Sequence, residues 1–322
     1  NRRRRRSLGM AGTSKQQSLK GRRKLVADAD IQLSIVIAAW NGDALLRQCL
    51  MSLEGQTAKI GSEVIVISNF SMVSTVEFGI PVKFLELPET ATVPELRSRG
   101  IGLSRGKIIA LLEDHCILDS KWCQEIRKAH ESADVAIGGP VENASIDHAL
   151  DWAVYLYDYG KYMLPSEQGP VGALSGLNVS YKRAAMDEIS DFYQDGFFET
   201  IVNDELKRRG YFLRLWPQAI VYHNKSYELK RAAEHSFHLA RSYAARRVFK
   251  VSRLTHVLFA LFSLLLPVLL PARIVSTTFK KGRNIAPLLR SFPFIVLLMF
   301  IWSYGEFCGY LFGAGKSADQ WR

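Results

Sequence analysis

The sequence predicts an α/β fold, a doubly wound and mostly parallel sheet, followed by amphipathic and membrane helices. Three observations lead to this prediction. Short apolar runs alternate with helical patterns along the first two thirds of the chain. Polar residues follow directly on these runs, as they do at the carboxyl ends of parallel strands. Two longer apolar stretches lie near the C-terminus, each close to the ~20 residues that span a bilayer.

The first expected strand covers residues 33–39, a continuous apolar run typical of strands buried on both faces. It ends at a turn over 40–43, which can cap a helix whose apolar residues recur at helical spacing over 45–53. A second buried strand covers 64–67 and ends at Ser68 and Asn69. This is the start of a strand, helix, strand alternation.

The alternation continues to a third polar strand end. A shorter strand over 82–85 and a helix over 94–104 lead into a strand over 107–112, which ends in Glu113, Asp114 and His115. The carboxyl ends of parallel strands share one edge of a sheet, where metals and phosphates bind. We therefore expect these polar residues to lie near those at positions 39–41 and 68–69.

Later segments continue the α/β pattern. In chain order we expect a helix over 119–132, a strand over 135–137, a glycine-punctuated loop over 172–181 that enters a strand, helices over 182–189 and 199–209, and an extended segment over 213–223. The aromatic-rich stretch 152–162 has two interpretations. Its tyrosines could stack on a sugar, or the stretch could be a half-buried helix that packs on the core.

Charge divides the chain into parts. Residues 1–24 hold ten Lys and Arg and no acidic residue, residues 25–224 hold 17 basic and 27 acidic residues, and residues 225–322 hold 15 and 4. We expect a basic disordered tail over 1–30 and an acidic soluble domain over 31–224. The basic flanks suit anionic lipid headgroups. Because the basic residues avoid the folded domain, no nucleic-acid partner is expected.

The C-terminal third is expected to meet a membrane. Residues 225–253 mix basic and apolar side chains as an interfacial amphipathic helix does. Two hydrophobic membrane segments follow within 254–313, and a tail covers 314–322. Two full spans would export a basic connecting loop, against the positive-inside rule. We therefore favour two shallow or re-entrant segments over two clean spans, with the catalytic domain facing the cytoplasm.

Several short motifs follow one another in a specific order. They lie at 34–41, 48–57, 63–67, 97–102, 113–115, 176–178, Glu199 and 217–223. Each motif is weak alone, but their sequence resembles that of the family 2 glycosyltransferases, which have the GT-A fold. The resemblance covers about residues 33–223. It implies a glycosyltransferase that takes a nucleotide-diphosphate sugar, a UDP-sugar by family default, and uses a divalent cation.

The resemblance also implies roles for individual residues. The donor side comprises Ala39, Asn41, Asn69, Arg97, Arg99, Glu113 and Asp114; the metal side comprises Asp114, His115 and His223; the acceptor side comprises Gly176 and Asn178. Arg97 and Arg99 could clamp the diphosphate or could be ordinary helix-surface charges. Asn69 stands where many members carry an acid that reads the base, so no residue here proves uridine.

Two features of the motifs bear on the chemistry. His115 stands where the family's metal-binding Asp usually lies, which favours a softer cation such as Mn²⁺ over Mg²⁺ or makes tight metal binding optional. Glu199 lies eleven residues before Gly210, the spacing at which members place their catalytic base. Asp195 is the second choice for the base. Asp204 and Glu205 fit an ordinary solvated helix face better.

These observations predict an inverting, non-processive glycosyltransferase that acts on a lipid-linked or membrane-delivered acceptor, in polysaccharide or glycolipid biosynthesis. The chain has no Gln-x-x-Arg-Trp motif, which processive synthases of the family carry, and its two hydrophobic segments are too few for a polymer channel. Two alternatives stay open. One is a sugar nucleotidyltransferase, and the other is a non-catalytic membrane scaffold that keeps the fold.

Overall fold

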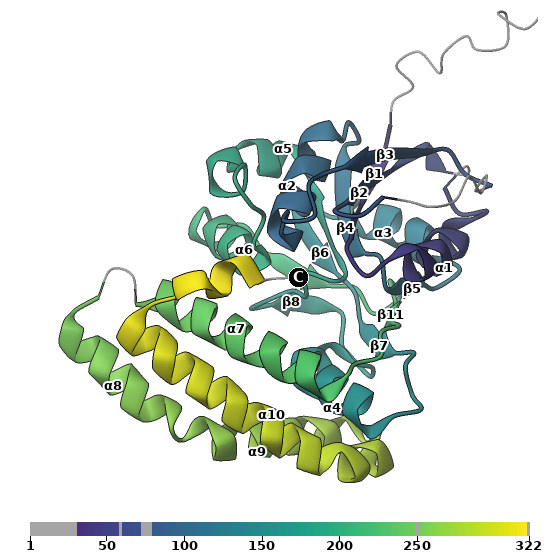
Figure 1. The fold of residues 1–322 in the computed structure, drawn as a ribbon. Helices are drawn as coiled ribbons and strands as arrows, with labels where there is room; N and C mark the ends of the chain where they lie inside the picture. The colour runs from purple at the N-terminus through teal and green to yellow at the C-terminus, as the bar shows by residue number, and fades with distance from the viewer. Residues whose placement is uncertain (1–30, 58–59, 72–78, 249–250, 321–322) are drawn as a thin grey trace, which may run out of the picture.

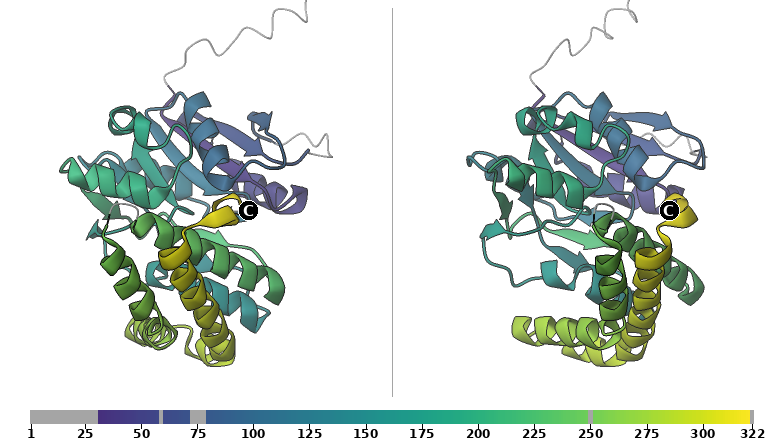
Figure 2. Two further views of the ribbon diagram at one scale, coloured as in Figure 1. Left: turned by 60° about the vertical axis from the view of Figure 1, so that its left-hand side comes forward. Right: turned by 90° about the vertical axis from the view of Figure 1, so that its left-hand side faces the viewer.

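The computed structural model describes residues 31–57, 60–71, 79–248 and 251–320. The basic tail predicted for residues 1–30 lies outside the described residues. Figure 1 shows two parts, a sheet with helices on its faces and a layer of long helices beneath it. The views in Figure 2 place the helical layer below the sheet domain from other directions as well, with the C-terminal end returning to the junction between the two parts.

A large mixed sheet organises the first part, which confirms the predicted α/β fold class. Its eight strands lie in the order β3, β2, β1, β4, β9, β6, β10, β8. They are β1 (Leu33–Ala39), β2 (Ser62–Ser68), β3 (Val82–Glu86), β4 (Ile108–Glu113), β6 (Ala136–Gly138), β8 (Gly169–Val171), β9 (Val179–Lys182) and β10 (Leu213–Leu215). The first four in this order run parallel to one another, while β9 is antiparallel to both β4 and β6. The sheet is therefore mostly parallel.

The register of the parallel strands aligns their polar ends. Ala39 at the end of β1 pairs with Ser68 on β2, and Ala38 pairs with Glu113 at the end of β4. All seven residues of β1 are buried, as its continuous apolar sequence predicts for a strand covered on both faces. The residues that follow these strands therefore meet at one edge of the sheet.

Helices cover both faces of this sheet. They are α1 (Asp43–Leu53), α2 (Val93–Leu103), α3 (Trp122–Ala129), α5 (Arg183–Asp187) and α6 (Glu199–Arg208), with a short 3₁₀ helix η3 (Ser190–Phe192). The contact of α2 with β1 depends on Gly100, where a Cβ would lie 2.2 Å from Val36 Cγ1. Close approach at this glycine brings the N-terminal part of α2 towards the sheet edge.

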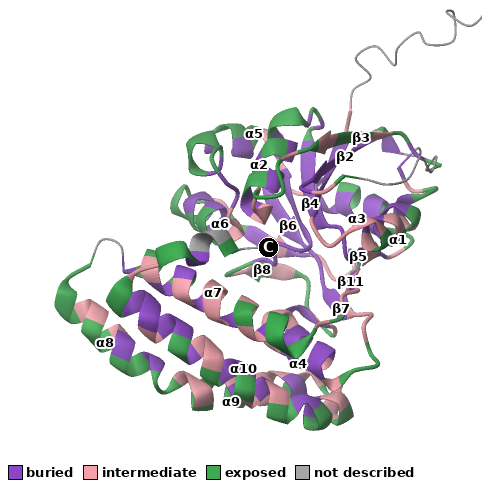
Figure 3. Cartoon of the chain, in the orientation of Figure 1, coloured by how far each residue is buried: buried purple, intermediate pink, exposed green. Residues whose placement is uncertain are grey.

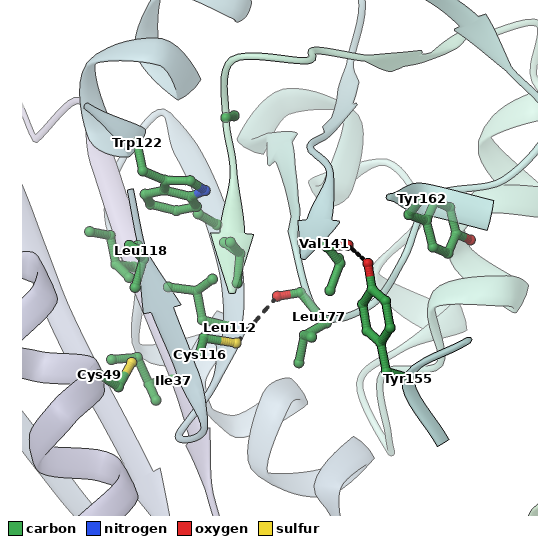
Figure 4. Close-up of a cluster of buried hydrophobic side chains, with 14 of the residues drawn as sticks. Ile37, Cys49, Leu112, Cys116, Leu118, Trp122, Val141, Tyr155, Tyr162 and Leu177 are labelled. Atoms are coloured by element: carbon green, nitrogen blue, oxygen red, sulfur yellow. Dashed lines mark hydrogen bonds between the residues drawn. The ribbon is translucent and has the colours of Figure 1, made fainter. Parts of the chain in front are cut away.

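A small second sheet extends the site edge. It comprises β5 (Cys116–Leu118), β11 (Val221–His223) and β7 (Val141–Asn143), in the order β5, β11, β7. The extended segment expected over 213–223 therefore splits between two sheets. Figure 4 shows the core beside it, where Cys116 Sγ donates to Leu177 O and Tyr155 OH donates to Val141 O.

The ambiguous aromatic stretch 152–162 is helical. Helix α4 (Ala149–Asp158) continues into the 3₁₀ helix η2 (Gly160–Tyr162). Tyr155 is fully buried, and Tyr162 is also buried, so both belong to the core rather than to an open sugar platform. The interpretation as a helix that packs on the core is the one the structure supports.

Four helices form the helical layer, namely α7 (Leu229–Arg247), α8 (Arg253–Ser263), α9 (Leu266–Lys281) and α10 (Ile285–Phe312), and a 3₁₀ segment η4 (Gly315–Gln320) follows. By length and composition, α10 can cross a membrane; α8 and α9 pass the same test only as a pair, bent by 60°. The break occurs because Pro267 has no N–H to donate to Ser263 O. Ser303 Oγ on α10 donates to that carbonyl instead, at 2.7 Å.

Helices α7 and α10 pack at very short range. A Cβ at Gly309 would lie 2.4 Å from Arg241 O, and one at Gly305 would lie 2.6 Å from Phe237 O. On the α7 side the contact is made by small residues, with Ala240 and Ala244 both fully buried. The segment predicted as an interfacial helix over 225–253 thus buries its small-residue face against α10. Its interfacial role remains a prediction.

The outer face of the helical layer is apolar and exposed. Figure 3 shows that α8 and α9 carry mostly exposed and intermediate residues, in contrast with the buried strands of the sheet. Leu254, Phe262 and Val268 expose 69%, 62% and 71% of their surface. So many exposed large apolar side chains on one face mark an interaction surface.

Candidate active site

Asp114 fixes the turn after β1. Its Oδ2 accepts hydrogen bonds from the backbone N–H groups of Trp40 and Asn41, at 2.7 and 2.6 Å, and its Oδ1 accepts from Asn41 Nδ2 at 2.7 Å. The side chain is fully buried. Both carboxylate oxygens are therefore engaged by the protein itself, and three donors compensate the cost of burying the charge.

Arg97 lies between two carboxylates. Its Nη2 donates to Glu113 Oε1, and its Nη1 lies 3.2 Å from Glu199 Oε2. Only 6% of the Arg97 side chain is exposed, whereas 26% of the Glu199 side chain is exposed. Burial lowers the pKa of Arg97, but the two carboxylates outweigh it and raise that pKa above its ordinary value. Arg97 thus joins the end of β4 to the start of α6.

Gly176 completes this arrangement. Its carbonyl accepts from Arg97 Nη2 at 3.0 Å. A Cβ at this position would lie 2.9 Å from Glu199 Oε2 and 3.1 Å from Arg97 Nη1. A side chain at this position would displace the Glu199 carboxylate from its place beside Arg97. The acceptor-side residue predicted from the family resemblance therefore touches the predicted base.

His115 and His223 lie face to edge, with ring centroids 4.9 Å apart. The two residues come from adjacent strand ends, since His223 on β11 pairs with Cys116 on β5. His223 Nε2 lies 3.2 Å from Tyr227 OH. Burial, and then the neighbouring His115, hold the pKa of His223 well below its ordinary value, so this ring is neutral.

The two histidines also carry buried nitrogens that have no hydrogen-bond partner among the residues that the structure describes, Nε2 of His115 and Nδ1 of His223. Glu113 Oε2 lies 3.5 Å from His115 Nε2. Within the described ranges, no group of three His, Cys, Asp or Glu side chains is arranged to hold a metal ion.

A cavity of about 1140 Å³ opens at the sheet edge, and we call it the sheet-edge cavity. It is lined by Trp40, Asn41 and Asn69 from the ends of β1 and β2, by Glu86 at the end of β3 and Glu89 just after it, and by Lys225, Tyr227, Glu228, Arg231, Glu234, His235 and His238 from the chain around α7. Strand ends of this kind are where open α/β sheets bind ligands, and Lys225 and Arg231 can contact phosphates there even though acidic side chains lie beside them.

Lys225 and Arg231 are functional candidates that the sequence interpretation missed. It treated them as part of a membrane-facing amphipathic segment. In the structure Lys225 Nζ lies 5.4 Å from the Trp40 ring and 5.2 Å from the Tyr227 ring. Burial lowers the pKa of Lys225, opposed by Glu113 and Asp114. The position of Lys225, two residues after His223, is the one signal that could have identified it.

Asp158 is a second missed residue. It ends α4 and carries a pKa raised to about 7, chiefly by burial, with a hydrogen bond from Tyr157 opposing the rise. Glu113 also raises the pKa, while Lys161 and Lys225 lower it. Perturbed carboxyl groups of this kind concentrate at functional sites. No motif in the sequence singles out this aspartate.

Arg99 and Asp195 lie elsewhere. Both line a neighbouring cavity of about 700 Å³, which shares only Leu87 and Pro88 with the sheet-edge cavity. Arg97 and Arg99 are two residues apart on α2 and therefore point to different sides of the helix. The structure brings Glu199, not Asp195, to the Glu113 cluster.

The remaining predicted residues have structural contacts. Asn178 is fully buried: its Nδ2 donates to Pro140 O and Ala219 O, and its Oδ1 accepts from Trp122 Nε1. Asn69 Nδ2 donates to Ala91 O at 3.0 Å. The carbonyl of Ala39 accepts from the backbone N–H of Asn69, at 3.2 Å. These groups hold the sheet edge in shape, and Asn69 also faces the cavity.

Comparisons with known proteins agree with this fold. Residues 34–190 match the family model of glycosyl transferase family 2. The mannosyltransferase PcManGT from Pyrobaculum calidifontis, solved in complex with GDP-Man and Mn²⁺, is similar in structure, with a TM-score of 0.50 and 12% sequence identity. The match covers 94% of this chain and 93% of that chain. No curated protein matches the sequence significantly.

The fold and the matches define a glycosyltransferase with the GT-A fold. More specifically, the chain carries a glycosyl transferase family 2 domain, which confirms the family and the enzyme class that the motif order predicts. At 12% identity, the likeness to the mannosyltransferase concerns the fold alone.

Proposed function

We propose that this enzyme transfers a single sugar, with inversion, from a nucleotide-diphosphate sugar to a lipid-linked or membrane-delivered acceptor. The observation that carries the proposal is the position of Glu199. Arg97 holds it beside Glu113, at the end of β4, and the next residue, Asp114, accepts hydrogen bonds from the backbone of Trp40 and Asn41, which line the sheet-edge cavity. A carboxylate placed there, and partly exposed, can meet both a donor and an incoming hydroxyl.

The proposed reaction is a direct displacement. The acceptor oxygen forms a bond to the anomeric carbon, the bond from that carbon to the diphosphate breaks, and Glu199 receives the hydroxyl proton. The nucleoside diphosphate leaves with the electron pair. Lys225 and Arg231 line the sheet-edge cavity. They can stabilise the negative charge of the leaving diphosphate, because pre-positioned cations stabilise charge that develops in the transition state.

Glu113 and His115 are the side chains that would hold a divalent cation, together with oxygens of the donor diphosphate. The unpartnered Nε2 of His115 supports this assignment. His223 is the third candidate ligand. Asp114 contributes differently from the family expectation, since both its oxygens hold the turn at residues 40–41. When bound, the cation would neutralise the diphosphate.

For the nucleotide, uridine stays a prediction of the family resemblance. PcManGT was solved with GDP-Man, which concerns that protein. In this chain, Asn69 stands at the expected base-reading position, but its Nδ2 already donates hydrogen bonds to Ala91 O and Glu89 O. UDP-sugars and GDP-sugars should therefore be compared directly in the donor assay.

For the membrane, we propose that α8–α10 insert from one face as a shallow hairpin. The turn between α9 and α10 is bound to the catalytic domain: Lys281 Nζ donates to Pro165 O at 2.9 Å, and Arg283 pairs with Glu142 at 3.3 Å. A loop that contacts the domain cannot lie on the opposite side of the bilayer. Such a hairpin keeps the basic turn inside, in agreement with the positive-inside rule.

Replacing Glu199 by Gln tests the proposed base. Glu199→Gln keeps the size of the side chain but removes proton acceptance, so transfer should fall by roughly 10²–10⁴-fold while nucleotide affinity stays within a few-fold. Asp204→Asn is the matched control, because Asp204 lies on the same helix with 74% of its side chain exposed. The assay is mass spectrometry of membrane lipids incubated with a panel of nucleotide sugars.

The outcome of this assay also separates the rival classes. Near-normal transfer by Glu199→Gln would move the base elsewhere, first to Asp158 or Asp195. Release of pyrophosphate instead of nucleoside diphosphate would identify a nucleotidyltransferase. If the wild-type protein shows neither transfer nor donor hydrolysis, the remaining interpretation is a non-catalytic membrane scaffold.

The hairpin is tested by labelling a cysteine at Lys280, which is exposed near the end of α9. The native cysteines at 49, 116, 123 and 308 are all buried, so the background is low. An impermeant thiol reagent should leave Lys280→Cys unlabelled in intact cells and label it after permeabilisation. Lys230→Cys on α7 should behave in the same way. Labelling of Lys280→Cys alone from outside would mean two full spans.

A further inference from the structure

A second cavity, of about 440 Å³, lies between the catalytic domain and the helical layer. We call it the α9 cavity. It is lined by Leu156, Tyr157, Asp158, Gly160 and Lys161 from α4 and the start of η2, Tyr243 and Arg247 from α7, Leu266, Leu270, Arg273, Ile274, Thr277 and Thr278 from α9, and Met299, Trp302 and Glu306 from α10. The sheet-edge cavity shares none of these residues.

Positive charge gathers in this cavity without a matching anion. Lys161, Arg247 and Arg273 all line it, and no ion pair forms at any of the three within the part of the chain that the structure describes. Lys161 and Arg273 lie close enough that the charge of Arg273, after burial, lowers the pKa of Lys161. Two cations that repel each other in a cavity form a site that an anion would stabilise.

The two carboxyl groups of the cavity do not neutralise these cations by direct contact. Glu306 accepts from Trp302 Nε1 at 2.7 Å and from Tyr310 OH at 2.8 Å, so both of its oxygens are engaged by neutral donors. Burial raises the pKa of Asp158 to about 7, which leaves it uncharged in an appreciable share of molecules at neutral pH. Glu306 and Asp158 are outnumbered by the cations Lys161, Arg247 and Arg273, so the cavity keeps an excess of positive charge.

One wall of the cavity is apolar. Leu266, Leu270 and Ile274 repeat every four residues and so form one stripe along α9. On the same helix, Val268 and Leu269 expose 71% and 56% of their surface. The apolar wall of the cavity is thus continuous, around one helix, with the exposed apolar face of the layer. A ligand with an anionic head and an apolar tail matches both features.

The charge of the proposed base reaches residues at this cavity. The charges of Glu199 and Arg273 both act on Lys161, and both act on the buried Tyr162 that follows it. We therefore propose that the α9 cavity binds the phosphate of the lipid-linked acceptor, with Lys161 and Arg273 as its main contacts and the lipid chain along α9. This inference rests on the proposed function, because it assigns the acceptor of the same reaction.

The bound phosphate would orient the acceptor without taking part in bond formation. The reacting group remains a hydroxyl of the lipid-linked sugar, whose proton passes to Glu199 as the glycosidic bond forms. Lys161 and Arg273 are binding residues in this scheme. The contacts of arginine and lysine with a phosphate contribute affinity and fix its position. The apolar stripe contributes the preference for a lipid.

The test measures binding of dodecyl phosphate, presented in phosphatidylcholine nanodiscs, to the full-length protein by titration calorimetry. Dodecanol in the same nanodiscs and inorganic phosphate in solution are the comparison ligands. We expect Lys161→Met and Arg273→Met each to weaken dodecyl phosphate binding by roughly tenfold or more, since each removes a charged contact. Lys280→Met, an exposed cation on α9 outside the cavity, should bind like the wild type.

Each result either supports or overturns the inference. Equal binding of dodecyl phosphate by wild type and Arg273→Met would overturn it, and so would equal affinity for dodecanol. Equal affinity for inorganic phosphate would reveal a free-anion site instead. Donor hydrolysis is measured in parallel and should be unchanged in Lys280→Met, which lies outside the cavity. If the wild type does not hydrolyse the donor, the proposed function alone is overturned, because dodecyl phosphate binding is measured separately by calorimetry.

Discussion

The sheet edge and the helical layer bury their side chains in different ways. At the sheet edge, buried charges are paired: Arg97 bridges Glu113 and Glu199, and Asp114 accepts three hydrogen bonds. In the helical layer, α10 buries glycine against alanine on α7, and α8 exposes leucine and phenylalanine. Polar contacts hold the sheet edge in register, whereas close packing holds the helical layer together. Among the described residues, the cations of the α9 cavity form no ion pair.

If this contrast is correct, removing a single buried charge should damage the sheet half most. Arg97→Met leaves Glu113 and Glu199 without their shared partner, and breaking a buried pair in this way costs about 3–5 kcal/mol. Arg99→Met, two residues along the same helix but exposed, should stay within about 0.5 kcal/mol of wild type. Urea unfolding of both variants gives the comparison. Equal stability would show that Arg97 is not the structural bridge we infer.

The helical half should instead respond to added volume. In Gly309→Val, the new Cβ alone would lie 2.4 Å from Arg241 O and 2.7 Å from Ala244 Cβ, so α10 must move away from α7. Overpacking of this kind costs about 1–3 kcal/mol, and we expect the upper end because a backbone atom is involved. Ala286→Val, at an exposed position in the first turn of α10, is the control. Thermal unfolding in detergent should separate the two variants.

Acid should weaken the sheet half. His130 is buried, which lowers its pKa to about 3 from an ordinary value of 6.5. Between these values the unfolded chain binds a proton that the folded chain does not, so stability falls as pH drops below 6.5. The loss is about 2 kcal/mol at pH 5. His130→Gln should remove that share of the pH dependence. An unchanged slope between pH 7 and pH 5 would mean that His130 is charged in the fold.

The smallest effect concerns the cation at the sheet edge. Because an imidazole ligand favours softer ions, Mn²⁺ should restore activity after chelation at least as well as Mg²⁺, and His115→Asp should shift the preference towards Mg²⁺ by a few-fold. The ratio of the two activities is the measurement. Full activity in excess chelator would show that the donor binds here without metal.

Hydrophobic pattern alone specifies the sheet half well. The apolar runs at β1, β2 and β4 are buried strands, and the polar residues after them meet at one edge, because parallel strands of similar length must align their ends. The order of the motifs predicted the family, and the resemblance to that family singled out Glu113 and Glu199 as site residues. Local sequence suffices for these features since each depends on neighbours along one strand or helix.

Other features needed the tertiary structure. Nothing in the sequence shows that Arg97 is buried between two carboxylates while Arg99 is exposed, because that depends on how closely α2 approaches the sheet at Gly100. The break between α8 and α9 depends on Ser303 of α10, which satisfies the carbonyl left free by Pro267.

The sequence by itself thus determined the buried strands β1, β2 and β4 and the fold class, and its resemblance to a family supplied the candidate base. The tertiary structure alone decided which cations line the sheet-edge cavity and which line the α9 cavity. Lys225 lines the first and Lys161 the second. The physical reason is that a charge acts through space, on whatever the fold brings near it, whereas a sequence pattern records only the spacing along the chain.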